Sequence, residues 1–331
     1  MQWTLPFVVI LMLSKLLAPS AQADMPSVIE ALLSRETRLM VFAPHPDDES
    51  LGAGGLIQRA LSLGGKAKVV FMTNGDGYPE GVELLDHISH PTAKDYREYG
   101  DERRVEAGHA TAALGLLEGD VIFLGFPDGG LTNLWKTFRS DSHSYRSPFT
   151  LEKRPPPSEV IVPKTDYNGH DLKKEIKRVL DDFKPNLLVV PAPRDQHPDH
   201  SSTYHFVIEA LRSLQKKGTG PKPAVITYLV HFGQWPVGQG SGTGSTLKPP
   251  RRFPGRETNW VSFALNPKER EVKRKAILKH HSQMLVMGRF LLSFARDNEL
   301  FVVDRQAGNR GLKRGQQGRL SRVPHAPKKQ G

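Results

Sequence analysis

The chain has 331 residues, of which 38% are hydrophobic, which is enough to form one large α/β domain or two small ones. It contains no cysteine, which excludes thiolate nucleophiles, disulfides and cysteine-ligated zinc. Much of the formal net charge of +11 lies at the C-terminus, where residues 306–331 carry seven Lys or Arg and no acidic residue.

The first 23 residues have the pattern of an export signal. Residues 5–17 are almost wholly apolar, and Ala21-Gln22-Ala23 provides small residues of the kind found at a signal-peptidase site. The apolar run is shorter than the roughly 20 residues that a membrane span needs. We therefore expect residues 1–23 to be a signal peptide and the mature protein to be periplasmic or extracellular. Because no Lys or Arg precedes the run and Lys15 lies within it, an uncleaved N-terminal anchor is the alternative.

Strands and helices are expected to alternate along most of the chain. Apolar runs predict strands at 38–43, 66–72, 121–124, 186–191 and 225–232. Helical spacing predicts helices at 28–33, 51–63, 103–116, 172–183, 202–215 and within 267–294. This alternation is typical of βαβ units, so we expect a Rossmann-like, mostly parallel sheet flanked by helices, in a domain spanning residues 24–304. Two polar stretches, 128–169 and 234–257, interrupt the alternation, and we expect them to border a functional site.

The basic C-terminal segment, residues 305–331, is rich in Gly and Gln and has few apolar residues, so we expect it to be disordered. Its charge could give weak contact with an anionic surface, and a solvated tail without a dedicated partner is an equal alternative. It contains no aromatic interleaving or nucleic-acid motif, so no specific nucleic-acid partner is expected. The sequence leaves the oligomeric state open.

Two short polar segments each follow a predicted strand and carry ligands typical of a metal site. They are His45-Pro-Asp47-Asp48-Glu49 and His197-Pro-Asp199-His200. His45 and Asp48 are three residues apart in a turn that opens a helix, so their side chains can converge, and His200 can complete the set from another strand end. Two imidazoles, one carboxylate and an open position suit catalytic Zn²⁺, and Fe²⁺ accepts the same ligands. Ligands of parallel sheets bind beyond the carboxyl ends of the strands, where both segments lie.

The remaining polar residues of the two segments suit catalytic roles. Asp47 is next to a ligand and free to take a proton from metal-bound water. His197 is placed to donate a proton to a leaving nitrogen or to stabilise an oxyanion. Asp199 fits a supporting role, in which it holds His197 or a ligand imidazole in one tautomer.

Each segment has a structural alternative when it is taken alone. Asp47-Asp48-Glu49 after a proline could be a helix N-terminal cluster favoured by the helix dipole. The segment from His197 to His200 could be a polar turn. Because both segments occur in one chain, each after a buried strand, we favour the metal site.

The two segments together resemble the PIG-L/LmbE family of zinc-dependent N-acetylglucosaminyl deacetylases and amidases. The resemblance extends over roughly residues 38–290. Further matching segments are Thr73-Asn74-Gly75, Arg103-Arg-Val-Glu106-Ala, Leu114-Gly115, Leu124-Gly-Phe-Pro-Asp128-Gly-Gly-Leu131 and His281-Ser-Gln283.

The resemblance implies roles for the residues at matching positions. His45, Asp48 and His200 match zinc ligands, Asp47 matches the general base, His197 the residue that assists the tetrahedral intermediate, and Asp199 its polar neighbour. Arg103 and Asp128 match positions associated with substrate binding. For Arg103 the alternative is a surface salt bridge with Glu106 on the same helix. For Asp128 it is a turn residue before two glycines.

The expected reaction is hydrolysis of an N-acetyl group from an N-acetylglucosamine-containing substrate or glycoconjugate. One alternative is an amidase that acts on a larger acylated amino-sugar conjugate. Another, from a different class, is an exported carbohydrate-binding protein without activity, which the presence of Asp47 and His197 disfavours because a binding module needs no base.

Overall fold

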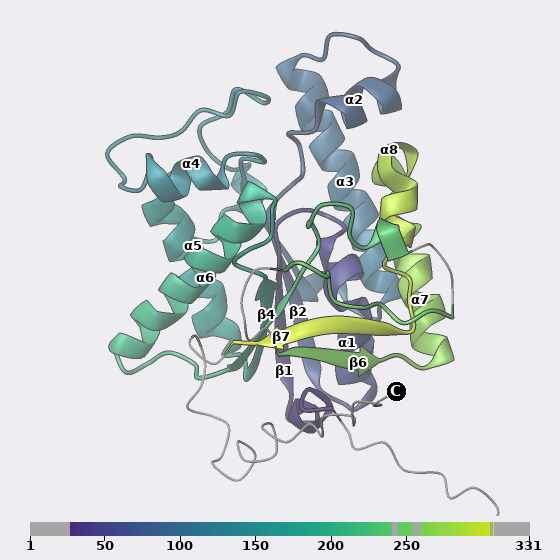
Figure 1. Cartoon of the computed structure of the whole chain (residues 1–331). Coiled ribbons are helices and arrows are strands. Elements are labelled where there is room, and N and C mark those ends of the chain that lie inside the picture. Colours follow the sequence, from purple (N-terminus) through teal and green to yellow (C-terminus); the bar gives the residue numbers. More distant parts are fainter. Residues whose placement is uncertain (1–26, 240–243, 254–258, 305–306, 308–331) are drawn as a thin grey trace, which may run out of the picture.

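The computed structural model describes residues 27–239, 244–253, 259–304 and 307 (Figure 1). The predicted signal peptide, residues 1–23, lies outside the described residues, as does the predicted basic tail apart from Ala307. Within the described ranges, no helix combines the length and the apolar character needed to cross a bilayer.

A seven-stranded sheet runs through the described part of the chain, in the order β3-β2-β1-β4-β5-β7-β6. The strands are β1 (Arg38–Ala43), β2 (Lys66–Thr73), β3 (Val121–Phe126), β4 (Leu187–Pro191), β5 (Ala224–Tyr228), β6 (Trp260–Ala264) and β7 (Asn298–Val303). The first five strands of this order pair in parallel, and β7 pairs antiparallel with both β5 and β6. The predicted α/β fold with a mostly parallel sheet is confirmed.

Helices cover both faces of the sheet (Figure 1). One layer contains α1 (Asp48–Ser62), α3 (Ala93–Ala113), α7 (Pro267–Ile277) and α8 (His281–Leu292). The other contains α4 (Leu131–Lys136), α5 (Gly169–Phe183) and α6 (Pro198–Lys216). The short helix α2 (Pro79–Asp86) packs on α3 and α8.

The central strand β1 shows why the sheet is covered on both sides. Its side chains alternate between two cores: Leu39 and Val41 join the one beneath α1 and α3, and Met40 and Phe42 join the one beneath α5 and α6. All four are fully buried. A strand buried on both faces requires a continuous apolar run, which is the pattern from which β1 is predicted.

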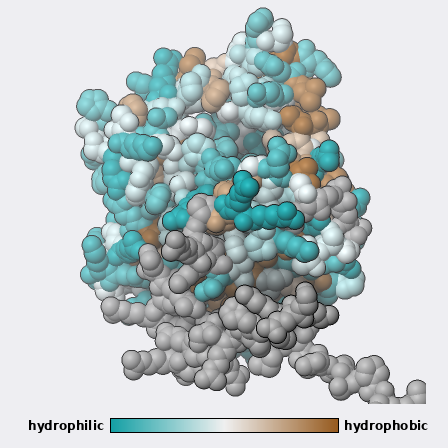
Figure 2. Space-filling view, in the orientation of Figure 1, coloured by the Kyte–Doolittle hydropathy of each residue, from teal (hydrophilic) through white to brown (hydrophobic). Residues whose placement is uncertain are grey.

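The surface is mostly hydrophilic, with apolar side chains gathered where α2 and α8 lie (Figure 2). Leu84 of α2 is 46% exposed and Leu285 of α8 is 58% exposed. The opposite side of α8 packs against the core through Leu291.

Several elements differ from the sequence prediction. Helix α3 begins ten residues before the predicted start at residue 103, because its first turns are largely charged and lack clear apolar spacing. The stretch 128–169 contains the helix α4, and the helical region 267–294 is divided at residues 278–280 into α7 and α8. The predicted helix at 28–33 is a single 3-10 turn, and the strand predicted at 225–232 ends at Tyr228. The sequence does not predict α2, β6 or β7.

The parallel pairing of β1 with β4 brings two distant segments to one edge of the sheet. The chain leaves β1 at residue 43 and enters α1 at Asp48, and it leaves β4 at residue 191 and enters α6 at Pro198. Both predicted metal-binding segments therefore occupy strand-to-helix turns at the same edge, which is the usual ligand-binding edge of a parallel sheet.

A close helix–sheet contact fixes the start of α1 at this edge. A Cβ atom at Gly52 would lie 2.3 Å from a ring carbon of Tyr228, so only glycine allows this approach. The Tyr228 hydroxyl in turn donates a hydrogen bond to the carbonyl of Phe42, at 3.0 Å. This packing sets the position of α1 relative to the ends of β1 and β5.

Candidate metal centre and active site

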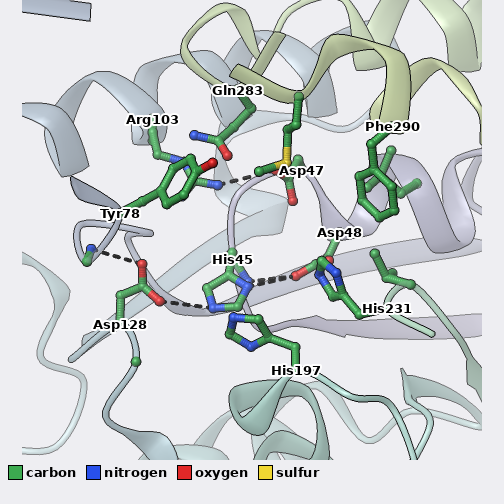
Figure 3. A pocket seen from close by; sticks show the side chains of 15 residues that line it. His45, Asp47, Asp48, Tyr78, Arg103, Asp128, His197, His231, Gln283 and Phe290 are labelled. Carbon is green, nitrogen blue, oxygen red and sulfur yellow. Dashed lines mark hydrogen bonds and ion pairs between the residues drawn. The ribbon is translucent and has the colours of Figure 1, made fainter. Parts of the chain in front are cut away.

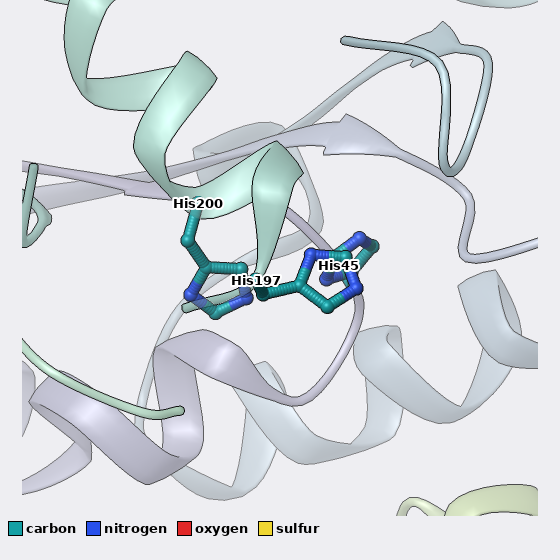
Figure 4. A group of neighbouring side chains, drawn as sticks. All are labelled: His45, His197 and His200. Carbon is teal, nitrogen blue, oxygen red and sulfur yellow. The ribbon is translucent and has the colours of Figure 1, made fainter. Parts of the chain in front are cut away.

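The histidines of the two segments face one another across the sheet edge (Figure 4). The ring centroid of His45 lies 4.7 Å from that of His197 and 5.4 Å from that of His200. Both His45 and His200 are buried, the latter fully. The structure thus brings together residues about 150 positions apart, as the sequence predicts.

One carboxylate oxygen lies between the two histidines predicted to be ligands (Figure 3 draws His45 and Asp48). Asp48 Oδ2 is 3.3 Å from His45 Nδ1 and 3.2 Å from His200 Nε2. Potential ligand atoms of His45, His197 and His200 lie within 4.8 Å of one another, as do those of Asp48, His200 and His231. These overlapping groups share His200, so the ligand atoms gather in one small volume.

The donor set fits a divalent cation. Both ring nitrogens of His200 and Nε2 of His45 are buried without a well-directed hydrogen bond, although carboxylate oxygens lie 3.0 to 3.2 Å away. Buried polar atoms are normally paired. Of these nitrogens, His200 Nε2 faces Asp48, and an unpaired imidazole nitrogen in this position suits a metal between the two groups. The nitrogen and oxygen atoms of His45, Asp48 and His200 match in type and number the protein ligands of a catalytic zinc site.

A second carboxylate lies behind each histidine. Asp195 Oδ2 is 3.2 Å from His200 Nδ1 and also accepts hydrogen bonds from the backbone N–H groups of Val230 and His231, at 2.9 and 3.1 Å. Asp128 Oδ1 is 3.0 Å from His45 Nε2. Carboxylates that face the far nitrogen of a ligand histidine fix its tautomer and orientation. This leaves His45 Nδ1 and His200 Nε2, the nitrogens near Asp48, to face the cation.

The electrostatics of the metal-free cluster follow from these pairs. Burial alone would lower the pKa of His200, but Asp195 and Asp48 raise it to about 10. Burial would raise the pKa of Asp48, but His200 and His45 hold it well below its usual range. Without metal, the cluster therefore retains protons that a cation must displace.

Asp47 lies beside the ligands in an unusual backbone conformation, with φ 128° and ψ −31°. A positive φ of this kind is unfavourable for a residue with a side chain and persists only where its surroundings impose it. Burial and the neighbouring Asp48 raise the pKa of Asp47 to about 7, although Arg103 acts in the opposite direction. A carboxyl group with a pKa near neutrality is suited to accept a proton.

Arg103 reaches Asp47 from α3 rather than pairing on the surface. Its Nη2 donates to the carbonyl of Pro46 at 2.7 Å and lies 3.3 Å from Asp47 Oδ2, and its Nη1 donates to the carbonyl of Gly75 at 2.8 Å. Arg103 is only 3% exposed, and Glu106 accepts hydrogen bonds from Ser282 instead. The alternative of a surface salt bridge between Arg103 and Glu106 is therefore wrong.

The orientation of His197 is set locally by the start of α6. Its Nδ1 accepts a hydrogen bond from the backbone N–H of Asp199 at 3.3 Å, so the other nitrogen, Nε2, carries the proton of the neutral ring. Burial and the neighbouring His45 and His200 lower the pKa of His197 to about 4. The ring is therefore neutral near pH 7 and serves as an N–H hydrogen-bond donor.

The Asp199 carboxylate binds backbone N–H groups of the turn after β3. It accepts hydrogen bonds from the backbone N–H groups of Gly129 at 2.8 Å and Leu131 at 3.1 Å, and Oδ2 lies 3.5 Å from His45 Nε2. Of the two predicted supporting roles for this side chain, the structure thus places it beside the ligand imidazole. It also ties the turn after β3 to the metal-binding segments.

Asp128 is more than a turn residue. Besides its contact with His45, its Oδ2 accepts a hydrogen bond from the backbone N–H of Gly77 at 2.9 Å. It is 6% exposed. Burial opposes ionisation of Asp128, but His45 and Arg103 lower its pKa below the usual range, so the group is a carboxylate.

A cavity of about 220 Å³ opens over these groups (Figure 3). Its polar floor includes His45, Asp47, Asp48, Arg103, Asp128 and His197. Its less polar wall includes Leu51, Tyr78, Val230, Met287 and Phe290, the last two from α8. Of the two long stretches predicted to border the site, the first contributes Asp128 and Gly129, whereas no described residue of 234–253 lines the cavity.

Sequence reasoning misses several residues of this site. Asp195 lies only two positions before His197, and His231 lies within the predicted strand 225–232, so both were visible as polar residues close to a strand end. His280, directly before α8, and Gln283, within it, are remote in sequence from both segments, and their places depend on tertiary packing. Gln283 belongs to the matching segment His281-Ser-Gln283, but the sequence predicts no role for it.

Comparisons with known proteins agree with this architecture. Residues 40–211, just over half of the chain, match the family described as PIG-L: GlcNAc-PI de-N-acetylase. A 1D-myo-inositol 2-acetamido-2-deoxy-alpha-D-glucopyranoside deacetylase from Mycobacterium sp. (strain KMS) is 28% identical over 180 residues, covering 54% of this chain and 51% of the relative. A protein of the same name from Corynebacterium urealyticum is 25% identical over 261 residues, covering 75% of this chain and 71% of the relative. The chain thus spans about half the length of the first of these relatives.

Two solved structures share the fold. A triple mutant of a deacetylase of the teicoplanin biosynthetic pathway and the A40926 pseudoaglycone deacetylase Dbv21 each superpose with a TM-score of 0.50. Each is 17% identical in sequence, covering 81% of this chain and 97% of the matched chain. With the family match across both metal-binding segments, the chain belongs to the PIG-L family of deacetylases.

Proposed function

We propose that this protein is a metal-dependent hydrolase that removes the N-acetyl group from an N-acetylglucosamine-containing substrate. The observation that carries the proposal is the convergence of His45, Asp48 and His200 beside Asp47 at the floor of one cavity. Membership of the PIG-L family supports the reaction class. Relatives from Mycobacterium and Corynebacterium named as deacetylases of an acetamido sugar support the type of substrate.

The metal that suits this donor set best is Zn²⁺, with Fe²⁺ as an alternative, held by His45, Asp48 and His200. When bound, such a cation polarises the amide carbonyl and makes the attacking water more acidic. The contribution of the protein is to fix the ligands through Asp195 and Asp128, which face the far side of the two histidine rings.

Asp47 transfers the protons in this reaction, and His197 stabilises the developing negative charge. Asp47 takes the proton from water as the oxygen attacks the acetamide carbon. His197, neutral and protonated at Nε2, donates a hydrogen bond to the oxyanion that develops on the former carbonyl oxygen. Asp47 then returns its proton to the leaving nitrogen as the C–N bond breaks, which yields acetate and a free amine. The low pKa of His197 favours oxyanion stabilisation over proton donation to the amine.

The size of the cavity supports a small reacting group. Pockets that enclose a drug-sized ligand measure roughly 300–1,000 Å³. At about 220 Å³, this cavity suits the acetamido end of a sugar, with the rest of the substrate extending beyond its mouth. The choice of an acetyl group over the longer acyl group of the amidase alternative is supported by the relatives named as deacetylases of an acetamido sugar.

The test is acetate release from a panel that runs from the monosaccharide N-acetylglucosamine to chitooligosaccharides and glycolipids. Chelator-sensitive release that disappears in Asp47→Ala supports the proposal. Release of a longer acid from acylated conjugates, with no acetate from any member of the panel, supports the amidase alternative. Sugar binding without turnover of any amide supports the carbohydrate-binding alternative.

A further inference from the structure

The strained conformation of Asp47 requires contacts that hold it, and the structure supplies them from two sides. The first is Arg103, whose Nη2 donates to the Pro46 carbonyl and contacts the Asp47 carboxylate. The second is Glu49, whose Oε2 accepts a hydrogen bond from the backbone N–H of Asp47 at 3.1 Å. Glu49 is fully buried and takes no part in the mechanism above.

Glu49 is itself contacted by His280, a residue distant in the sequence. Its Oε1 lies 3.3 Å from Nε2 of His280, a fully buried residue directly before α8, and accepts a hydrogen bond from the Ser50 hydroxyl at 2.6 Å. The same His280 nitrogen lies 3.4 Å from Ser50 Oγ. The imidazole therefore faces the Glu49–Ser50 pair, and one carboxylate connects it to the backbone of Asp47.

Helix α3 connects the two sets of contacts, those of Arg103 with Asp47 and those of the residues around His280 with Glu49. Glu106, one turn after Arg103, accepts hydrogen bonds from the backbone N–H of Ser282 at 2.7 Å and from its hydroxyl at 2.6 Å. Helix α3 thus contacts Asp47 directly through Arg103, and through Glu106 it anchors the start of α8, next to the His280 that contacts Glu49. Residues 280–282 lie outside the region matched by the family model, which ends at residue 211.

We propose that Glu49 and His280 are positioning residues that hold the general base Asp47 in its reactive conformation. Glu49 fixes the backbone N–H of Asp47, and His280 fixes Glu49 by placing a ring nitrogen against its second oxygen. The proposal rests on the proposed function for its catalytic consequence, but the backbone restraint at Asp47 can be tested without any substrate.

The catalytic test compares Glu49→Gln, Glu49→Ala and His280→Gln with the control His281→Ala, an exposed neighbour of His280. Misplacement of a catalytic group by about 1 Å costs on the order of 10²-fold in rate. We expect kcat to fall by about that factor in Glu49→Ala and by less in Glu49→Gln, with KM and bound metal equal to wild type. The double variant Glu49→Gln/His280→Gln should be no slower than the slower single variant, because both changes act through one contact. Independent, multiplicative losses would overturn the proposal, as would metal loss that parallels the loss of activity.

The second test measures the restraint by stability alone. Asp47→Gly and Asp47→Ala both lack the carboxylate, but only glycine adopts a φ of 128° without strain. We expect Asp47→Gly to have a higher Tm than Asp47→Ala, and this difference to shrink in a Glu49→Ala background, where residue 47 can relax. The control compares His87→Gly with His87→Ala, because His87 also has a positive φ, 56°, at the end of α2. The Tm difference between these two variants should not depend on Glu49.

The two tests separate the possible failures. If the Tm difference between Asp47→Gly and Asp47→Ala is the same with and without Glu49, the positioning proposal is overturned, whatever the enzyme hydrolyses. If this Tm difference shrinks in the Glu49→Ala background but the protein releases no acetate, the result supports the positioning of Asp47. The same result counts against the proposed substrate. If Glu49→Ala fails to fold, the Glu49→Leu background provides the same comparison, because leucine fills more of the space and cannot accept the Asp47 N–H.

Discussion

The two strand-to-helix turns that build the site hold their functional groups in different ways. In the turn from β1 to α1, Asp47 has a φ of 128° and is contacted by Arg103 from α3 and by Glu49, which is contacted in turn by His280. In the turn from β4 to α6, His197 has an ordinary extended conformation, φ −75° and ψ 126°, and Pro198 begins the helix. The Asp199 N–H orients the His197 ring within the same turn. The base thus depends on long-range contacts in addition to a local one, whereas the proposed oxyanion donor is oriented within its own turn, so distant changes should affect the base first.

The largest effect should come from removing a ligand from either turn. In His45→Ala and in His200→Ala, we expect loss of bound metal and a fall in kcat/KM of at least about 10³-fold, since a Lewis-acidic cation contributes several kcal/mol to the transition state. Metal per chain and acetate release are measured on the same preparations, with His281→Ala as the control. Retention of metal in both variants would place the cation elsewhere.

The local turn is tested by His197→Ala, which removes the imidazole and with it the Nε2–H donor. Loss of one oxyanion donor lowers kcat by about 10²–10³-fold. We expect a fall of this size with unchanged metal content and a nearly unchanged KM, measured by steady-state acetate release. An increase in KM at constant kcat would instead assign His197 to substrate binding.

The contacts behind the ligands should have an intermediate effect. Asp195→Asn removes the charge that faces His200 Nδ1 and leaves the side-chain shape unchanged. Removal of such a partner typically weakens metal binding by about 10–100-fold. Competition with a chelator measures the affinity, and Asp101→Asn, on the exposed side of α3, serves as control. Equal affinities in both variants would show that Asp195 has no part in holding the metal.

The smallest effect concerns the strain in the first turn. Backbone strain of this kind costs on the order of 1–3 kcal/mol. Asp47→Gly should therefore exceed Asp47→Ala in free energy of unfolding by about that amount, as measured by denaturant titration. Equal stabilities would mean that residue 47 carries no strain, and the comparison of the two turns would then lose its basis.

The sequence predicts the centre of the sheet and the floor of the site well, and the reasons are local. The apolar run that forms β1 stops at Pro44, so both the strand and the polar segment after it can be located. The predicted ligands His45 and Asp48 follow this run closely, and His200 lies in the first turn of the helix after β4. The start of α3 was harder to predict, because its first turns are charged.

What the sequence could not reveal depends on contacts between remote residues. The contact between Glu49 and His280 joins positions 231 apart, and no spacing rule relates them. In the same way, the motif Arg103 to Glu106 suggested a pair within one helix, whereas packing directs Arg103 toward Asp47 and Glu106 toward Ser282. The strands β6 and β7 lie at the end of the sheet and pair antiparallel, and β6 follows a long connection from β5, so neither is predicted from a βαβ pattern.

The most direct test of the central claim is a paired measurement of bound metal and acetate release in Asp47→Asn, a variant that retains the shape of the side chain but cannot accept the proton. We predict metal content equal to wild type and a kcat lower by about 10²–10⁴-fold, the range typical of a general base. Activity within about threefold of wild type, with metal still bound, would contradict the role of Asp47 and with it the proposed mechanism.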